Sequence, residues 1–267
     1  MLTADGTQVI DLAAIALSII TFSVGAVADL RTREVQDRLW LFYGSAGSAL
    51  TLVRFVLTPS ELMLGLLSVT LTCTISVLLF FLGFMGGADS KAFICLAATL
   101  PLNPTILKPM IGYVLPFFPL TVLISSFVLS ATTSLWTVMR NFRAYLKEGK
   151  TMFQEFGQEA WYSKLMAVLI GFRVDQEELR KNTFLYPIEV ADSSRFSGRR
   201  FKLSFNVDSD REKEVRQLLS SLSNSSTRVW VTPGLPMLLF VLVGLLFTVS
   251  VGDLVVGGLF GIMARAR

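Results

Sequence analysis

The stretch LMLGLLSVTLTCTISVLLFFLGFM, residues 62–85, is followed at once by GGADSKAF, residues 86–93. The first part holds 24 residues without a charge, and a helix needs about 20 apolar residues to cross the hydrocarbon core of a bilayer. The second part puts Asp89 and Lys91 directly after that run. Because a charge beside a membrane segment is costly, the acidic residue points to a functional site.

The composition of the whole chain is that of a polytopic membrane protein. Hydrophobic residues make up 52% of the 267 residues and charged residues 16%, and the mean hydropathy is +0.60. Further apolar runs lie at residues 12–28, 39–57, 117–139 and 235–251, and an irregular one begins near Ala92. Prolines between residues 101 and 119 should end that irregular helix by about Leu100. We therefore predict a polytopic α-helical membrane protein with six transmembrane helices.

The residue types present exclude several kinds of chemistry. Histidine is absent, which removes Ser-His-Asp triads, Cys-His pairs and HExxH zinc sites. The two cysteines, Cys73 and Cys95, lie in apolar runs without CxxC spacing. We expect no metal site and no cofactor. Carboxylates, hydroxyls, thiols and lysines remain as candidates for chemistry.

A charged region interrupts the apolar pattern. Residues 143–228 contain 15 Lys/Arg and 12 Asp/Glu, which are interleaved rather than gathered in a basic stripe. This pattern is typical of a solvated domain, so no nucleic-acid partner is expected. We predict three regions: residues 1–140 with transmembrane helices one to five, a small α+β soluble insertion at 141–232, and residues 233–267 with helix six and the C-terminus.

Local patterns predict several elements of the insertion. Residues 161–172 are amphipathic or membrane-associated, and RFKLSFNV (200–207) alternates as a strand does. Ser209 and Glu212 have capping-box spacing and should open a helix that runs to about Leu222. RVWVTP (228–233) should form a last short strand.

The basic residues predict the orientation in the cell membrane. With six spans and an outer N-terminus, the loop with Arg31, Arg33 and Arg38 lies on the same face as Lys91 and the insertion. The N-terminus and the 58–61 loop contain no Lys or Arg. The positive-inside rule then places the insertion and any site on this face at the cytoplasmic side.

The same count of spans brings two acidic residues to one depth. The first span ends at Asp29 on the inner face, and the fourth begins there with Asp89. Two neighbouring aspartates in a partly dehydrated site share one proton, as an acid proteinase requires. The ionised carboxylate takes a proton from water, and the protonated one hydrogen-bonds the carbonyl oxygen of the substrate. Asp29 and Asp89 are therefore the candidate catalytic residues.

Other interpretations of these acids stay open on physical grounds alone. Asp89 followed by Ser90 is compatible with a simple helix cap, and Asp29 with an ion pair to Arg31 or Arg33. A proton- or cation-coupled transporter or channel would use Asp29 and Asp89 as binding groups. A membrane anchor or receptor for the insertion would leave both dispensable. Asp11 and Asp253, near the opposite face, are interpreted as interfacial residues.

Three motifs add a family resemblance. VADLRTREVQDRLW (27–40), GGADSKAF (86–93) and WVTPGLP (230–236) resemble the prepilin peptidase group of GxGD aspartic proteases, specifically its archaeal preflagellin peptidase branch. The likeness extends to the number of spans and the place of the insertion. It implies that Asp29 and Asp89 are catalytic and that Asp37 is not. It also implies an aspartic endopeptidase that removes the short basic leader of preflagellins or type IV prepilin-like precursors at the cytoplasmic membrane face.

The resemblance is imperfect at one position. The chain reads Gly86-Gly87-Ala88-Asp89, with alanine where the family pattern has glycine. We expect Gly86 and Gly87 to supply backbone angles closed to other residues, and Ala88 to be strained if its φ angle is positive. The paired CxxC motifs of bacterial relatives are missing, which implies a peptidase without a zinc site and without methyl transfer.

Glycines before the fourth span and prolines after it predict that this short helix is a mobile element. Without substrate, the two carboxylates could then lie too far apart for catalysis.

Overall fold

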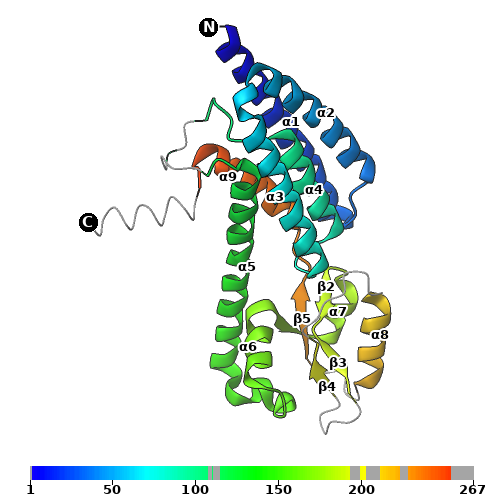
Figure 1. The fold of residues 1–267 in the computed structure, drawn as a ribbon. Helices are drawn as coiled ribbons and strands as arrows, with labels where there is room; N and C mark the ends of the chain where they lie inside the picture. Colours follow the sequence, from blue (N-terminus) through cyan, green and yellow to red (C-terminus); the bar gives the residue numbers. More distant parts are fainter. Residues whose placement is uncertain are drawn as a thin grey trace, which may run out of the picture. The chain divides into compact units, whose positions relative to one another are not determined.

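The computed structural model describes residues 2–107, 110, 115–192, 199–202, 211–222 and 228–253. The chain forms two compact units, the first from residues 1–130 and 236–267 and the second from residues 131–235. The described helices of the first unit are α1 (Leu2–Thr32), α2 (Asp37–Leu57), the 3-10 turn η1 (Pro59–Glu61), α3 (Leu62–Phe81), α4 (Gly87–Thr99), the start of α5 (Phe118–Glu148) and α9 (Met237–Ser250) (Figure 1).

Four described helices are long and apolar enough to cross a membrane. They cover Asp5–Thr32, Asp37–Leu57, Pro59–Phe81 and Phe118–Lys147. Helix α4 has 13 residues and the described part of α9 has 14, so six transmembrane helices remain a prediction. Helix α4 ends at Thr99, as the prolines that follow it predicted.

Packing in the first unit puts small side chains inside and large apolar ones outside. The buried face of α3 consists of Gly65, Ser68, Thr72 and Ser76, whereas its leucines are mostly exposed. Helix α4 packs against α2 and α3, and α1 packs against α2 and α9. Small residues at helix contacts let backbones approach closely, and lipid solvates the large apolar side chains, so this distribution is typical of membrane helices.

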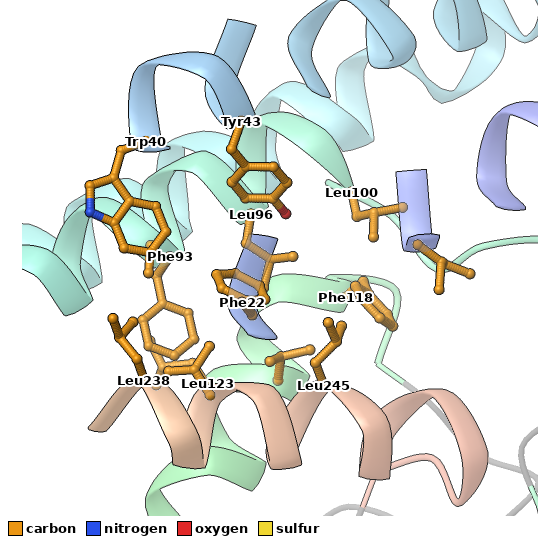
Figure 2. Close-up of a cluster of buried hydrophobic side chains, with 14 of the residues drawn as sticks. Phe22, Trp40, Tyr43, Phe93, Leu96, Leu100, Phe118, Leu123, Leu238 and Leu245 are labelled. Carbon is orange, nitrogen blue, oxygen red and sulfur yellow. The ribbon is translucent and has the colours of Figure 1, made fainter. Parts of the chain in front are cut away.

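The core of the first unit is an aromatic and leucine cluster shared by α1, α2, α4, α5 and α9 (Figure 2). The ring of Phe22 on α1 lies 5.5 Å from that of Tyr43 and 6.3 Å from that of Trp40, both on α2. The hydroxyl groups of Tyr43 and Ser18 share a hydrogen bond of 2.7 Å. A buried tyrosine needs such a partner, because an unsatisfied hydroxyl costs free energy. Leu96 of α4 is fully buried in the same cluster.

The second unit is a small α+β structure. Its strands are β1 (Phe172–Val174), β2 (Leu185–Pro187), β3 (Glu189–Ala191), β4 (Arg199–Phe201) and β5 (Val229–Pro233). The order β1-β5-β2 forms an antiparallel sheet, and β3 pairs with β4. The helices that lie wholly within this unit are the 3-10 segment η2 (Gly149–Phe156), α6 (Trp161–Ile170), α7 (Gln176–Lys181) and α8 (Arg211–Ser221).

The local predictions for this unit can be compared with its elements. Strand β5 starts one residue into RVWVTP, and α8 ends one residue before Leu222, which confirms both elements. Strand β4 covers only the first residues of the predicted strand at 200–207. Residues 203–207 and Ser209 lie outside the described residues.

The contact between α2 and α4 yields a test of the packing. A Cβ added to Gly47 would lie 1.8 Å from Thr99 Oγ1, far inside contact distance. Gly47→Ala should therefore destabilise the protein by about 1–3 kcal/mol, the usual cost of overpacking. Unfolding in detergent micelles measures this. Ala49→Val adds more volume at an exposed position of the same helix and should have little effect; equal losses in the two variants would contradict the packing of α2 on α4.

Candidate functional site

Asp29 lies in the last turn of α1, and its side chain is 14% exposed. The N–H of Leu238 donates to Asp29 Oδ2 at 3.4 Å. Leu238 is the second residue of α9, so the N-terminus of that helix faces the carboxylate. Free N–H groups at a helix N-terminus attract negative charge. The WVTPGLP motif thus leads into a helix end that contacts Asp29.

Asp89 lies in the first turn of α4. Gly86 is the N-cap of this helix, and its N–H donates to Asp89 Oδ2 at 3.2 Å. The next residue, Ser90, is buried and donates to the carbonyl oxygen of Ser76 at 3.3 Å, which joins α4 to α3. Asp89 is therefore a helix-capping residue, as one of the alternatives proposed, but capping does not account for what lies opposite it.

The fold brings the two aspartates together. Their carboxylates are close enough for the two negative charges to interact, and Arg33 interacts electrostatically with both. Arg33 Nη1 lies 4.0 Å from Asp29 Oδ1. No hydrogen bond joins the two carboxyl groups in the part of the chain that the structure describes. The prediction that they can separate without substrate is therefore not contradicted.

Arg33 has an unusual backbone. It is the one non-glycine among the described residues with a positive φ angle, 59°. It follows the last residue of α1, and its N–H donates to the carbonyl oxygen of Asp29 at 3.2 Å. Glycine is usual at this position, because a side chain costs about 1–2 kcal/mol in the left-handed region. An observed strain of this kind beside two carboxylates suggests a role for the guanidinium.

The motif residues before Asp89 act differently from the expectation. Gly86 has φ −73° and Gly87 and Ala88 lie in α4, so the expectation that Gly86 and Gly87 need angles closed to other residues is wrong. Ala88 is not strained for the same reason. The absence of a side chain at Gly86 matters because of its distance from Asp89: a Cβ there would lie 3.0 Å from Asp89 Oδ2. A Cβ on Gly87 would lie at an ordinary contact distance of 3.7 Å from the ring of Phe80. Gly86 leaves room for the carboxylate.

Asp37 lies outside this pair. Its Oδ1 forms an ion pair of 2.6 Å with Lys91 Nζ, and both side chains are largely exposed. The pair links the first residue of α2 to α4, and therefore joins two of the motif segments. Exposed ion pairs contribute at most about 1 kcal/mol.

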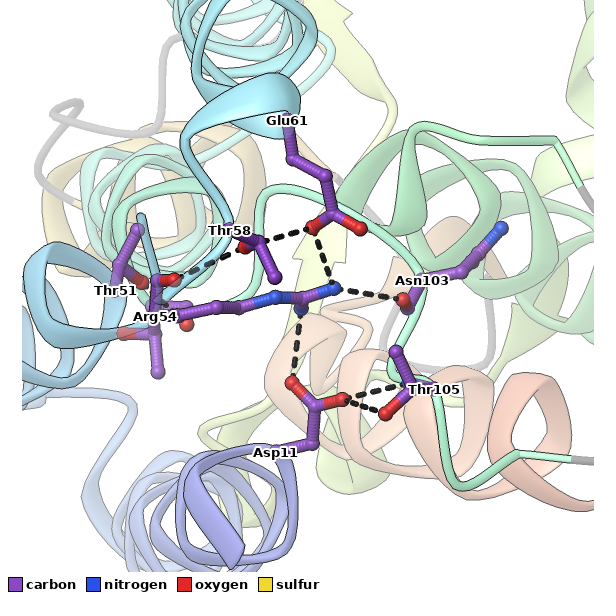
Figure 3. Close-up of polar contacts among 8 residues, drawn as sticks. Asp11, Thr51, Arg54, Thr58, Glu61, Asn103 and Thr105 are labelled. Carbon is purple, nitrogen blue, oxygen red and sulfur yellow. Dashed lines mark hydrogen bonds and ion pairs between the residues drawn. The ribbon is translucent and has the colours of Figure 1, made fainter. Parts of the chain in front are cut away.

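A buried polar network holds the other end of α4 (Figure 3). Arg54 is 3% exposed; its Nη1 pairs with Asp11 Oδ1 at 2.9 Å, and its Nη2 donates to Glu61 and to the carbonyl oxygen of Asn103, each at 3.2 Å. Asp11 Oδ2 also accepts hydrogen bonds from the backbone and hydroxyl of Thr105. Asp11, interpreted from the sequence as an interfacial residue, is thus buried against a guanidinium of the neighbouring helix.

Two more hydrogen bonds fix the segment in which α4 ends. Thr51 donates to the carbonyl oxygen of Thr99 at 2.8 Å, and Ser68 donates to that of Pro101 at 2.5 Å. At the opposite end, Gly83 precedes α4 with a φ angle of 75°. Close to Asp89, Ser90 joins α4 to α3 and Lys91 joins it to α2, so this end is held as well.

The groups at the site are suited to proton transfer. Among the described residues, no three His, Cys, Asp or Glu side chains are grouped as a metal ion would require. Two interacting carboxylates with a guanidinium beside them can hold, donate and accept a proton.

Sequence motifs located Asp29 and Asp89 but not their partners. Of the partners, Arg33 was predicted only as one of two possible ion-pair partners of Asp29, and Leu238 was not predicted. A basic residue where a helix should end in glycine is a usable pattern for Arg33, although it requires the end of α1 to be known. The contact with Leu238 joins residues 209 positions apart, and no local pattern indicates it.

Comparison with known proteins relates both parts of the chain to peptidase families. A family model described as "Type IV leader peptidase family" matches residues 15–135, and one described as "Archaeal Peptidase A24 C-terminus Type II" matches residues 163–254. A preflagellin peptidase of Methanococcus maripaludis is 24% identical over 238 residues, covering 86% of this chain and 91% of that protein. A preflagellin peptidase of Methanococcus voltae is 22% identical over 247 residues, which cover 90% of this chain and 95% of that protein.

The two matched models leave little of the chain uncovered, and the first includes both Asp29 and Asp89. The resemblance drawn from the motifs is confirmed at the level of these models: residues 15–135 match the type IV leader peptidase family, and residues 163–254 match the C-terminal region of archaeal A24 peptidases.

Proposed function

We propose that this protein is a membrane-embedded aspartic endopeptidase that removes the leader peptide from preflagellins or type IV prepilin-like precursors. One observation carries the proposal. Asp29, at the end of α1, and Asp89, at the start of α4, lie close enough for their charges to interact. The names of the similar proteins supply the class of substrate.

In the proposed reaction the pair holds one negative charge and one proton. We assign the charge to Asp29, because Arg33 and the N-terminus of α9 lie beside it. Asp29 then takes a proton from the attacking water, and Asp89 donates a hydrogen bond to the scissile carbonyl oxygen. The tetrahedral intermediate collapses as the leaving nitrogen is protonated.

The location of the pair suits a substrate with a membrane helix. Asp29 ends a candidate span, so it lies near one surface of the bilayer. A precursor whose apolar helix is embedded in lipid would present the bond just before that helix at the same level. We place this surface on the cytoplasmic side, because Arg31, Arg33 and Arg38 follow the span and basic loops stay inside.

A transporter or channel remains the alternative from another class. It would use the same two carboxylates to bind protons or cations. No observation on this chain favours it, and the family assignment favours the peptidase.

The catalytic pair is tested by amide substitutions. Asp29→Asn and Asp89→Asn should each lower cleavage of a tagged preflagellin-like precursor in membranes at least about 100-fold, since each removes an acid–base group. Asp37→Asn should cleave at close to the wild-type rate, because Asp37 only pairs with the exposed Lys91. Persistent cleavage in both site variants would reject the mechanism, and absence of cleavage by the wild type would reject the substrate.

Gly86 and Gly87 form a matched pair for testing the space around Asp89. Gly86→Ala puts a methyl group 3.0 Å from Asp89 Oδ2 and should move the carboxylate, so cleavage should fall about tenfold or more, as small misplacements of reacting groups do. Gly87→Ala should have little effect on cleavage. The same precursor assay measures both, and equal rates would show that room for Asp89 is not what Gly86 provides.

Arg33 allows activity and stability to be separated. Arg33→Gly removes backbone strain and the guanidinium together, so the thermal unfolding temperature should stay the same or rise while cleavage falls about tenfold. Arg38→Ala, at an exposed position in the first turn of α2, serves as the control for loss of one positive charge. Wild-type cleavage by Arg33→Gly would show that the guanidinium is not needed by the pair.

A further inference from the structure

In the second unit, the last part of α5 buries polar side chains and exposes large apolar ones. Here the polar side chains of Thr137 and Asn141 are buried. Large apolar and aromatic residues of the same segment are exposed beside Arg143 and Lys147: Leu135, Trp136, Met139, Phe142, Tyr145 and Leu146. A helix in water would show the opposite distribution.

Helix α6 has the same arrangement. Its small residues Ser163 and Ala167 are buried, and Ala167 joins a hydrophobic cluster of the second unit. The outward face of α6, which consists of Trp161, Tyr162, Leu165 and Met166, is exposed, with Trp161 at 75%. Four large side chains on one face of a ten-residue helix are too many for a surface in contact with water.

The two helices are joined by a buried amide. Asn141 Nδ2 donates to the carbonyl oxygens of Val168 and Gly171, at 2.9 and 2.6 Å. These carbonyls lie at the C-terminal end of α6, where the last turn leaves such groups unpaired. Helix α6 is therefore held at the level of the last turns of α5.

The length of α5 sets the depth of those turns. Helix α5 has 31 residues, which at about 1.5 Å per residue is longer than the hydrocarbon core of about 30 Å. Its last turns must therefore lie in the headgroup layer if its apolar start is embedded. Tryptophan, tyrosine and basic residues gather in that layer. Trp136, Arg143 and Tyr145 on α5 fit this pattern, as do Trp161 and Lys164 on α6.

We propose that the outward face of α6 lies in the headgroup layer of the bilayer and seats the second unit on the membrane. The occupant of this face is lipid, because the face continues the apolar stripe of α5, itself a candidate span. Trp161 and Tyr162 of this face and the neighbouring Lys164 are the aromatic and basic residue types that gather in that layer. The inference needs only a membrane-bound chain and is independent of the proposed peptidase activity.

Spin labels test this contact in the full-length protein. In a Cys73→Ala, Cys95→Ala background, a nitroxide is attached at Trp161→Cys, at Leu165→Cys or, as the control, at Lys181→Cys on α7. Trp161 is 75% exposed and the Lys181 side chain is 78% exposed. A difference in collision rates between these two labels therefore reports whether lipid or water surrounds them. In phospholipid vesicles, the ratio of collisions with oxygen to collisions with a water-soluble nickel complex should be several-fold higher at 161 and 165 than at 181.

Two results would overturn the proposal. Equal ratios at all three positions would mean that α6 faces water. Poor collision with both reagents, together with spin–spin broadening, would mean that a second copy of the chain covers the face. A measurement without cysteine changes checks the result: bromine-labelled lipids should quench the tryptophan emission of the wild type more than that of Trp161→Phe, and equal quenching would count against lipid contact.

Discussion

Contact with lipid instead of water is the constraint on which this structure depends. Because lipid solvates large apolar side chains, burying them between helices contributes little free energy. Close packing of small residues holds the helices together instead. The buried face of α3 consists of glycine, serine and threonine, and Gly47 of α2 lies directly against Thr99 of α4. These contacts position α4, and α4 carries Asp89.

Helix α4 is held by different contacts at its two ends. Beyond Thr99 it is tied by the Arg54 and Asp11 network, whose charges are buried and therefore costly unless well paired. Replacing such a network by apolar residues often costs little stability in proteins. Here the network fixes the far end of α4, while Asp89 at the near end follows a segment with a left-handed glycine. The near end is joined to α3 through Ser90 and to α2 through the exposed pair of Lys91 and Asp37.

The site shows which features a sequence can reveal. Asp29 and Asp89 could be found because each ends or begins an apolar segment, and counting spans puts both at one face. The reason first given for Gly86 was wrong, because glycine suggests an unusual φ angle by default, whereas here it provides space beside Asp89 Oδ2. For Asp11, the sequence indicated a depth in the membrane but not the guanidinium of Arg54 opposite it.

By itself, the sequence determined the apolar helices, the end of α4 at Thr99, the strand at 229–233 and the α8 helix, because hydropathy, proline and local periodicity act over a few residues. It also determined which two aspartates could meet. The tertiary structure alone decided what surrounds them: the strained Arg33, the N–H of Leu238 and the room left by Gly86. It also decided that Asp37 pairs with Lys91. These contacts join segments far apart in the chain, and their distances depend on how the helices pack, which no local pattern of residues records.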